Sequence, residues 1–203
     1  MSNNELVQGP ISGIEQKYIK FGDNAVKFKL DRLYEAFNLR VKLDDIKSVC
    51  AVESQLNIKL PRLPNTTKEI KPLESKIFWL GPDEWLVICH NQSSCLKDKV
   101  SFEEEECQHI GWVDVTDSRS LICLSGPSAH SVLEKGCPLD LHINTFPVNS
   151  CSQSVIGQAS VLIHRLQEHT TMNDLWEIYV ELSFTSYLWS WLLDAAAEYE
   201  PII

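Results

Sequence analysis

Apolar and polar residues alternate along several short stretches in the second half of the chain, and this pattern predicts β-strands. In residues 175–182 the apolar side chains alternate with Glu177, Tyr179 and Glu181. Such alternation is typical of a strand with one face on the core, so we expect its other face to meet water or a polar partner. Further strands are predicted over residues 111–117, 120–126 and 155–166.

Two uninterrupted apolar runs, KIFWL and EWLVIC, flank residues 81–84. Pro82 and Asp83 suit the central positions of a type I turn, so the two runs are expected to form a β-hairpin. The run over residues 85–89 contains no charged residue. This is typical of a central strand that is covered on both faces.

Apolar residues at helical spacing predict a helix over residues 44–58. A shorter helix is expected over residues 126–136, with Pro127 in its first turn. Residues 31–37 are expected to be locally helical between two extended stretches. The prolines and mixed charges of residues 59–75 favour an irregular connection, and residues 137–150 are also predicted as a loop.

The last predicted element is a helix near the C-terminus, whose apolar arc is wider than packing on one sheet requires. Trp189 and Leu193 cause this widening. Two interpretations remain open: the helix is sunk in its own core, or its second face meets another chain, where Trp is a common anchor. The expected stripe comprises Phe184, Tyr187, Leu188, Trp191, Leu192, Ala195 and Tyr199.

The excess of acidic residues argues against negatively charged partners. The chain has 28 acidic and 18 basic residues, which give a net charge of −10, so we expect neither nucleic acid nor an anionic membrane as a partner. No apolar run approaches the roughly 18 residues that a spanning helix needs, and the first ten residues do not resemble a signal peptide. The seven cysteines contain no CxxC pair and are expected to be reduced thiols, which predicts a cytoplasmic location.

No complete catalytic or cofactor motif is present in the local sequence: GxGxxG, P-loop, GxSxG and HExxH patterns are all missing. We therefore assign no catalytic, cofactor-binding or metal-binding residue. The acidic run at residues 103–106 is expected to be a solvated face. A loose cluster with the ligand types of a metal site is expected to be chance and consists of Cys89, His90, Cys95, Cys107 and His109.

Asp114 and Asp117 flank the end of a predicted strand, and Arg119 follows. These three residues have either a capping or turn role together with a surface ion pair, or a role in contacting a ligand or partner subunit. The residues as a whole predict an α+β domain. We expect a polar leader over residues 1–20 and a single compact unit over residues 21–203, possibly of two interleaved lobes.

WLGPDEWLV (79–87) resembles a signature of the gamma subunit of heterotetrameric sarcosine oxidase. Similar blocks follow in the order of that family at residues 113–142, 146–165 and 181–198. The resemblance covers about residues 79–198, whereas the first 60 residues match only vaguely.

This resemblance implies the fold of the folate-binding aminomethyltransferases, such as the T-protein of the glycine cleavage system, with antiparallel sheets and helices packed on them. It implies a complex that demethylates sarcosine oxidatively to glycine, with hydrogen peroxide and methylenetetrahydrofolate as products. FAD, FMN, NAD and tetrahydrofolate are then expected in the partner alpha, beta and delta subunits, and no cofactor is expected in this chain.

The expected role is assembly of the complex and closure of the path of the one-carbon intermediate, which water would otherwise intercept. One alternative is the same role in a related complex that acts on another N-methyl amino acid, such as N-methylglutamate. A free-standing folate-binding transferase is a second alternative, with Asp83, Glu84 and Asp114 as candidate pterin ligands. The candidate subunit-interface residues are Trp79, Asp83, Trp85, Arg119, Trp189 and Trp191.

Overall fold

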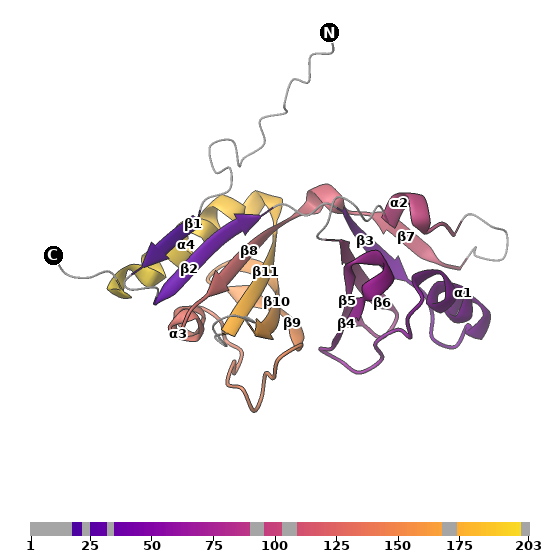
Figure 1. Cartoon of the computed structure of the whole chain (residues 1–203), viewed down its shortest axis with the longest axis horizontal. Coiled ribbons are helices and arrows are strands. Elements are labelled where there is room, and N and C mark those ends of the chain that lie inside the picture. Colours follow the sequence, from indigo (N-terminus) through magenta and orange to yellow (C-terminus); the bar gives the residue numbers. More distant parts are fainter. Residues whose placement is uncertain are drawn as a thin grey trace, which may run out of the picture.

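The computed structural model describes residues 18–21, 25–31, 35–89, 96–102, 109–167 and 174–199. These residues form two antiparallel sheets that pack against each other, and helices cover the outer face of each sheet (Figure 1). The layers are therefore helix, sheet, sheet and helix. This arrangement confirms the predicted α+β class with antiparallel sheets and packed helices.

The first sheet has six strands in the order β1-β2-β8-β11-β10-β9, and every pairing in it is antiparallel. Two strands come from the N-terminal part of the chain and four from the C-terminal half. The strands are β1 (Tyr18–Phe21), β2 (Val26–Asp31), β8 (Arg119–Ser125), β9 (Cys151–Ile156), β10 (Ala159–Gln167) and β11 (Asp174–Glu181).

The second sheet has five antiparallel strands in the order β4-β5-β6-β3-β7, and all of them lie between β2 and β8 in sequence. The chain thus leaves the first sheet after β2 and returns to it with β8. The strands are β3 (Glu35–Arg40), β4 (Thr67–Ile70), β5 (Ser75–Gly81), β6 (Glu84–Cys89) and β7 (Gly111–Asp114).

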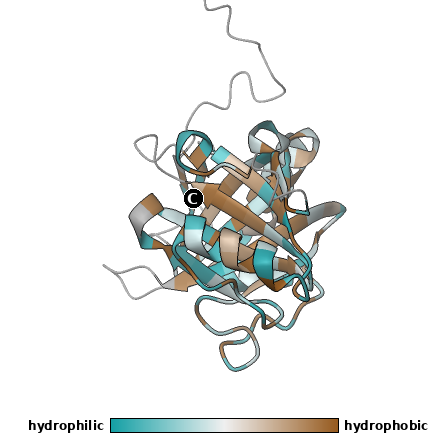
Figure 2. Cartoon of the chain, turned by 90° about the vertical axis from the view of Figure 1, so that its right-hand side faces the viewer, coloured by the Kyte–Doolittle hydropathy of each residue, from teal (hydrophilic) through white to brown (hydrophobic). Residues whose placement is uncertain are grey.

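In the part of the chain that the structure describes, four α-helices lie on the outer faces of the sheets. α1 (Ile46–Leu56) and α2 (Leu96–Lys99) share a hydrophobic core with the second sheet. α3 (Ala129–Glu134) and α4 (Thr185–Ala196) share another with the first sheet. In Figure 2 the strands are largely hydrophobic, whereas the helices mix hydrophilic and hydrophobic residues, as expected for helices with one buried face.

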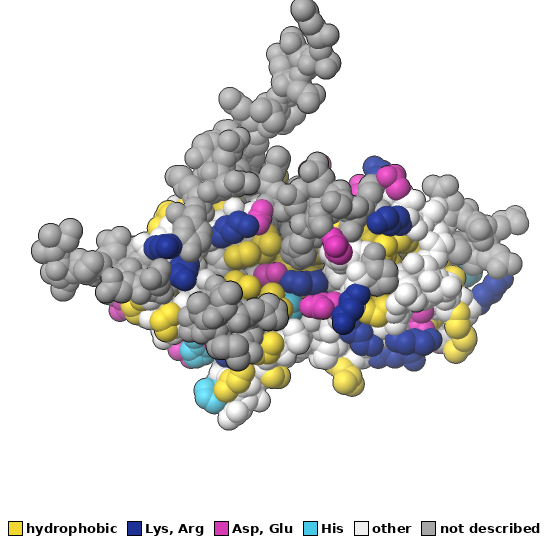
Figure 3. Space-filling view, in the orientation of Figure 1, with side chains coloured by type: hydrophobic (Ala, Val, Ile, Leu, Met, Phe, Trp, Pro, Cys, Tyr) yellow, Lys and Arg dark blue, Asp and Glu magenta, His cyan; other side chains and the backbone are white. Residues whose placement is uncertain are grey.

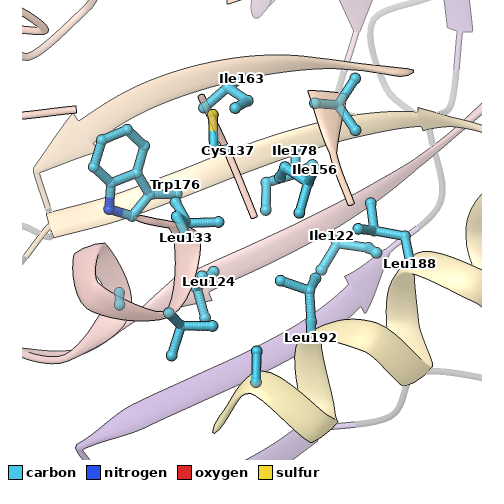
Figure 4. Close-up of a cluster of buried hydrophobic side chains, with 14 of the residues drawn as sticks. Ile122, Leu124, Leu133, Cys137, Ile156, Ile163, Trp176, Ile178, Leu188 and Leu192 are labelled. Atoms are coloured by element: carbon cyan, nitrogen blue, oxygen red, sulfur yellow. The ribbon is translucent and has the colours of Figure 1, made fainter. Parts of the chain in front are cut away.

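Leucine side chains of α3 and α4 fill the core between these helices and the first sheet. Leu188 and Leu192 point from α4 toward Ile122 of β8, and Leu133 of α3 lies beside Trp176 of β11 (Figure 4). These five side chains are fully buried. Burying a Leu or Ile side chain contributes roughly 1.5–3 kcal/mol, so this cluster fixes the helices on the sheet.

The structure confirms the helix predicted over residues 44–58 and the predicted hairpin. The Asp45 side chain caps α1 by accepting a hydrogen bond from the Ser48 amide at 3.1 Å, and Asn57 ends the helix in a left-handed conformation. β5 and β6 form the hairpin, and β6 lies between β5 and β3. Because residues 85–89 are at most 1% exposed, β6 is the covered central strand that its sequence predicts.

Several local predictions were wrong. Residues 31 and 35–37 are strand rather than helix, and the connection over residues 59–75 contains β4 and a 3-10 turn. The single strand predicted over residues 155–166 is interrupted at Gly157, whose φ of 58° makes the turn between β9 and β10. The short helix begins at Ala129, so Pro127 lies before its first turn.

The prediction for the polar face of β11 was also wrong. Glu177 and Tyr179 were expected to meet water or a polar partner, but they are only 7% and 0% exposed. Their face of β11 is covered by the second sheet, as the buried cluster of Tyr179 with Phe78 and Leu86 shows. Glu181, at the end of the strand, is exposed as expected.

The buried stripe of α4 is rotated from the one that was expected. Thr185, Leu188 and Trp189 are buried, whereas Phe184 and Tyr187 are 41% and 38% exposed. Much of this helix is therefore sunk in its own core, as one of the two open interpretations held. The exposed Phe184 and Tyr187 are still compatible with the other interpretation, in which a second face of the helix meets another chain.

Several predicted features lie outside the described residues, namely residues 1–17 of the leader, the acidic run at 103–106, His90, Cys95 and Cys107. The rest of the leader, residues 18–20, belongs to β1. None of the helices in the described residues is long and apolar enough to cross a membrane.

Candidate functional site

The layer between the two sheets is apolar in its middle and polar at both ends. Its middle combines Phe78, Leu86 and Ile88 of the second sheet with Leu162 and Tyr179 of the first. Charged side chains of both signs gather over the middle of the molecule, between its two halves (Figure 3). The polar groups between the sheets are therefore the candidates for a functional site.

At one end, the Glu177 carboxylate is surrounded by donors, and we call Lys76, His164, Glu177 and Tyr179 the Glu177 cluster. Lys76 Nζ donates to both carboxylate oxygens, at 2.6 and 2.8 Å. The Tyr179 hydroxyl donates at 2.9 Å, and His164 Nδ1 lies 2.8 Å from Oε2. Because an ionised carboxylate only accepts, His164 Nδ1 carries the proton of that bond.

The strand register brings the Glu177 cluster together. His164 of β10 lies directly opposite Glu177 of β11, and Tyr179 follows on the same face of β11. Lys76 comes from β5 of the other sheet, so its ion pair with Glu177 joins the two sheets. Phe78 packs edge-on against the rings of His164 and Tyr179, with centroids 5.1 and 5.2 Å away.

Burial sets the protonation states in the Glu177 cluster. It lowers the pKa of His164, against the opposing influence of the Glu177 charge, so the imidazole is neutral at pH 7. Burial and the Glu177 charge raise the pKa of Tyr179 well above its ordinary value, so the phenol stays protonated and donates. The Lys76 ammonium, the His164 Nδ1–H and the Tyr179 hydroxyl all donate to the Glu177 carboxylate. The cluster therefore serves the fold.

An open cleft of about 490 Å³ lies beside the Glu177 cluster and is lined in part by Lys76 and Glu177. The thiol of Cys123, which also lines it, has its pKa raised by burial to about 12 and is therefore not a nucleophile at neutral pH. Acidic side chains outnumber basic ones along this cleft. Across the described residues, no group of three or more His, Cys, Asp and Glu side chains is placed to hold a metal ion.

At the opposite end, a second open cleft of about 500 Å³ is lined by Ser118, Arg119, Glu181, Leu182 and Ser183. Arg119 lies directly across from Glu181 in the pairing of β8 with β11. Burial lowers the pKa of the Arg119 guanidinium, and the nearby charges of Glu181 and Glu84 oppose this effect. A partly buried cation of this kind is a candidate for recognising an anion.

The polar cluster predicted around Arg119 is only partly present. Asp114 accepts hydrogen bonds from the amide and the hydroxyl of Thr116, at 3.0 and 2.7 Å, and these bonds lower its pKa. This is the turn role that the plain interpretation gave it. Arg119 faces Glu181 on the neighbouring strand rather than Asp117.

Two of the candidate interface residues belong to the core of this chain. Trp85 is fully buried, and its Nε1 donates to the Pro61 carbonyl at 2.8 Å. Trp189 is 5% exposed and packs edge-to-face against Phe28 at a centroid distance of 6.2 Å. Because their side chains are covered by their own chain, Trp85 and Trp189 are corrected to core residues.

The other candidates reach the surface to different degrees. Asp83 is exposed at the hairpin tip, whereas Trp79 and Trp191 are partly buried. Trp191 packs closely on Gly136, where an added Cβ would lie 2.4 Å from the indole ring. The pairing of the exposed rings of Phe184 and Tyr187, with centroids 6.5 Å apart, was not anticipated from the sequence.

The Glu177 cluster was also missed from the sequence. Its available signal is weak: His164 and Glu177 each stand inside an apolar strand, in VLIHRL and LWEIYV. A charged residue within a buried strand needs a partner, but sequence alone does not identify Lys76, which lies 101 residues away.

Known proteins are similar to this chain in sequence and in fold. The profile of the sarcosine oxidase, gamma subunit family matches residues 42–198. The sarcosine oxidase subunit gamma of Corynebacterium sp. (strain P-1) is 35% identical over 128 residues, which are 62% of this chain and 60% of that protein. The protein of the same name from Arthrobacter sp. is 34% identical over 123 residues, or 61% and 57% of the two chains. The match thus spans about 60% of the length of these curated relatives.

Solved structures extend the similarity. A chain of the heterotetrameric sarcosine oxidase from Corynebacterium sp. U-96, in complex with pyrrole 2-carboxylate, has a TM-score of 0.76 at 25% identity, covering 96% of this chain and 97% of that one. The glycine cleavage system aminomethyltransferase T from Bartonella henselae has a TM-score of 0.54 at 15% identity, covering 78% and 43%. The second likeness shows the fold alone. Together they confirm the expected aminomethyltransferase-like fold.

Proposed function

Because this chain belongs to the sarcosine oxidase, gamma subunit family, we propose that it is the gamma subunit of a heterotetrameric sarcosine oxidase. The observation that carries this proposal is the likeness to a chain of such an enzyme over 96% of this chain and 97% of that one. A likeness over nearly the full length of both chains favours the same place in the same kind of assembly.

In this proposal the complex demethylates sarcosine oxidatively to glycine, with hydrogen peroxide and methylenetetrahydrofolate as products. FAD, FMN, NAD and tetrahydrofolate bind in the partner alpha, beta and delta subunits, in the cytoplasm. The sequence of this chain supports that division, since it has no glycine-rich dinucleotide motif.

The chain itself contributes assembly and shape rather than a reacting group. The buried Glu177 carboxylate is bound by Lys76, His164 and Tyr179, so the cluster holds the two sheets together. A rigid double-sheet body is a suitable wall for the path of a one-carbon intermediate that reacts with water. The exposed Phe184 and Tyr187 supply apolar surface for a partner chain.

Two other functions use the same fold. A complex that oxidises a different N-methyl amino acid requires no change in this chain, because a partner subunit selects the substrate. A free-standing folate-binding transferase needs an acidic residue free to grip the pterin. Of the three candidates, Glu84 is bound by Asn38 and Arg40, Asp114 is bound by Thr116, and Asp83 lies exposed at the hairpin tip. These contacts favour the subunit role.

Co-expression with the adjacent open reading frames, followed by pull-down through a tag on this chain, tests the proposal. We expect a yellow complex that consumes oxygen when sarcosine is added. A colourless, stable chain that comes down alone would contradict it. Folate binding to the lone chain would then favour the transferase: at 100 times its dissociation constant it raises the free energy of unfolding by about 2.7 kcal/mol.

A further inference from the structure

Among the residues that the structure describes, Arg119 has no bonding partner although it is partly buried. Among the described residues, no hydrogen bond or ion pair engages its guanidinium, which lines the cleft of about 500 Å³ at one end of the inter-sheet layer. By contrast, Arg165 donates to Asp174 and to two backbone carbonyls. A guanidinium carries five N–H donors, so Arg119 retains capacity for a planar acceptor.

The acidic neighbours of Arg119 do not fill this capacity. Glu84 Oε1 accepts from Asn38 at 2.7 Å and Oε2 accepts from Arg40 at 2.8 Å, so both oxygens are engaged. Glu181 lies directly across from Arg119 in the strand register, yet the two side chains do not form an ion pair. Their charges still influence the guanidinium, and they oppose the lowering of its pKa by burial.

Partial burial without a partner has a cost, because water is removed from donors that gain no acceptor in return. A bound carboxylate recovers this cost, since the planar fork of Arg matches the two carboxylate oxygens. The cleft is open, so the acceptor can arrive from outside the chain. These features suit a planar oxyanion, and a carboxylate is the oxyanion that an unmodified protein chain carries.

The surface next to the cleft is suited to a protein partner. Leu182 and Ser183 of the cleft wall lead directly into Phe184, which is 41% exposed and packs against Tyr187, which is 38% exposed. The Tyr187 hydroxyl accepts from the Gln158 amide at 3.1 Å, which holds its ring in place. Arg and Tyr are both enriched among the residues that dominate binding at protein interfaces.

We propose that Arg119 binds a carboxylate side chain of a partner subunit, which enters the cleft while an adjoining apolar segment covers Phe184 and Tyr187. This inference rests on the proposed function, because it requires the partner chain. A small free anion is disfavoured by the acidic side chains of Glu84 and Glu181 beside the guanidinium. A carboxylate held in place by further contacts overcomes that repulsion.

Charge reversal at Arg119 tests this interaction in the co-expressed complex. Arg119→Glu should weaken association with the partner by about 30-fold or more, the usual effect of removing one member of a buried interfacial charge pair. Arg119→Lys should retain part of the association, because it keeps the charge and loses the planar fork. The control Lys99→Glu changes the charge by the same amount at an exposed position of α2 and should alter association by no more than about two-fold.

A second readout separates binding from a structural role. Arg119→Met removes a partly buried, unpaired charge, so the isolated chain should melt at the same temperature or higher, while association still weakens. A fall of more than about 4 °C in the isolated chain would instead make Arg119 structural. The melting temperature is also compared in acetate and in chloride at equal ionic strength. If acetate stabilises the wild-type chain but not Arg119→Met, the cleft binds a small anion and the proposed partner contact is wrong.

The outcomes for the two proposals differ. Association of Arg119→Glu with the partner at wild-type strength would overturn the role of Arg119 and leave the subunit assignment standing. A wild-type chain that captures no partner would overturn the subunit assignment and with it this inference. Recovery of Arg119→Glu by an acid-to-lysine change in the partner would support both and identify the carboxylate.

Discussion

The Glu177 cluster should contribute strongly to stability, and removal of the Lys76 charge measures that contribution. Lys76 and Glu177 come from different sheets, and their side chains are only 17% and 9% exposed. In Lys76→Met the apolar stem is kept and the cation is lost. The Glu177 carboxylate then stays buried, with Tyr179 and His164 still donating to it.

The size of the effect follows from burial and from the bonds that survive. Breaking a buried ion pair by removing one partner costs about 3–5 kcal/mol. Because two donors remain and Lys76 is partly exposed, the free energy of unfolding should decrease by about 3 kcal/mol, the lower end of this range. For a chain of this length, 1 kcal/mol corresponds to about 2–4 °C, so the melting temperature should fall by about 6–12 °C.

Urea denaturation and thermal melting of the full chain, each with a matched control, measure this loss. Lys97→Met removes an exposed partner of Asp114, 3.7 Å away, and should cost less than about 1 kcal/mol. The double variant Lys76→Met/Glu177→Gln should be more stable than Lys76→Met alone, because no charge is stranded. If Lys76→Met behaves like Lys97→Met, the cluster does not hold the sheets together.

Two further predictions concern protonation and packing. Because burial lowers the pKa of His164, the unfolded chain takes up this proton near pH 6.5 and the folded chain only at lower pH. The free energy of unfolding should therefore decrease as the pH drops from about 6.5 to the lowered pKa of His164 in the folded chain. Denaturant titrations at pH 7.5 and 5.5 measure this decrease, and it should be smaller in His164→Gln than in the wild-type chain. Gly136→Ala places a Cβ 2.4 Å from the Trp191 ring and should cost about 1–3 kcal/mol. An unchanged melting temperature together with unchanged Trp fluorescence would show that Trp191 is not packed there.

Elements determined by local signals could be predicted from the sequence. The α1 helix has its cap at Asp45, and its buried face follows from helical spacing. The β5–β6 hairpin follows from a two-residue turn between apolar runs, and the full burial of β6 follows from its uninterrupted apolar sequence. In each case the residues that decide the structure are neighbours in the chain.

The Glu177 cluster could not be predicted in this way. Alternation along β11 shows that the two faces of the strand differ in polarity. The same sequence pattern results whether the polar face meets water or a second sheet. The stacking of the sheets decides between them, and it depends on contacts such as the one between Lys76 and Glu177, 101 residues apart. A charge inside an apolar strand signals a partner without identifying it.

The interface candidates show the same limit. Tryptophan occurs both in protein cores and at interfaces, and Trp85 and Trp189 lie in the core. A 3-10 turn over residues 182–184 precedes α4, and Phe184 of the turn and Tyr187 of the helix are exposed instead. Arg119 was selected for its place at a strand end, but only the structure shows that no described residue bonds to its guanidinium.

Oxygen consumption by the complex captured through a tag on this chain is the most direct test of the subunit assignment. The chain is co-expressed with the adjacent open reading frames, and the captured material is assayed with sarcosine and without substrate. We predict a flavin-coloured assembly in which sarcosine starts oxygen uptake. Capture of this chain alone, or of an assembly whose oxygen uptake does not respond to sarcosine, would contradict the assignment.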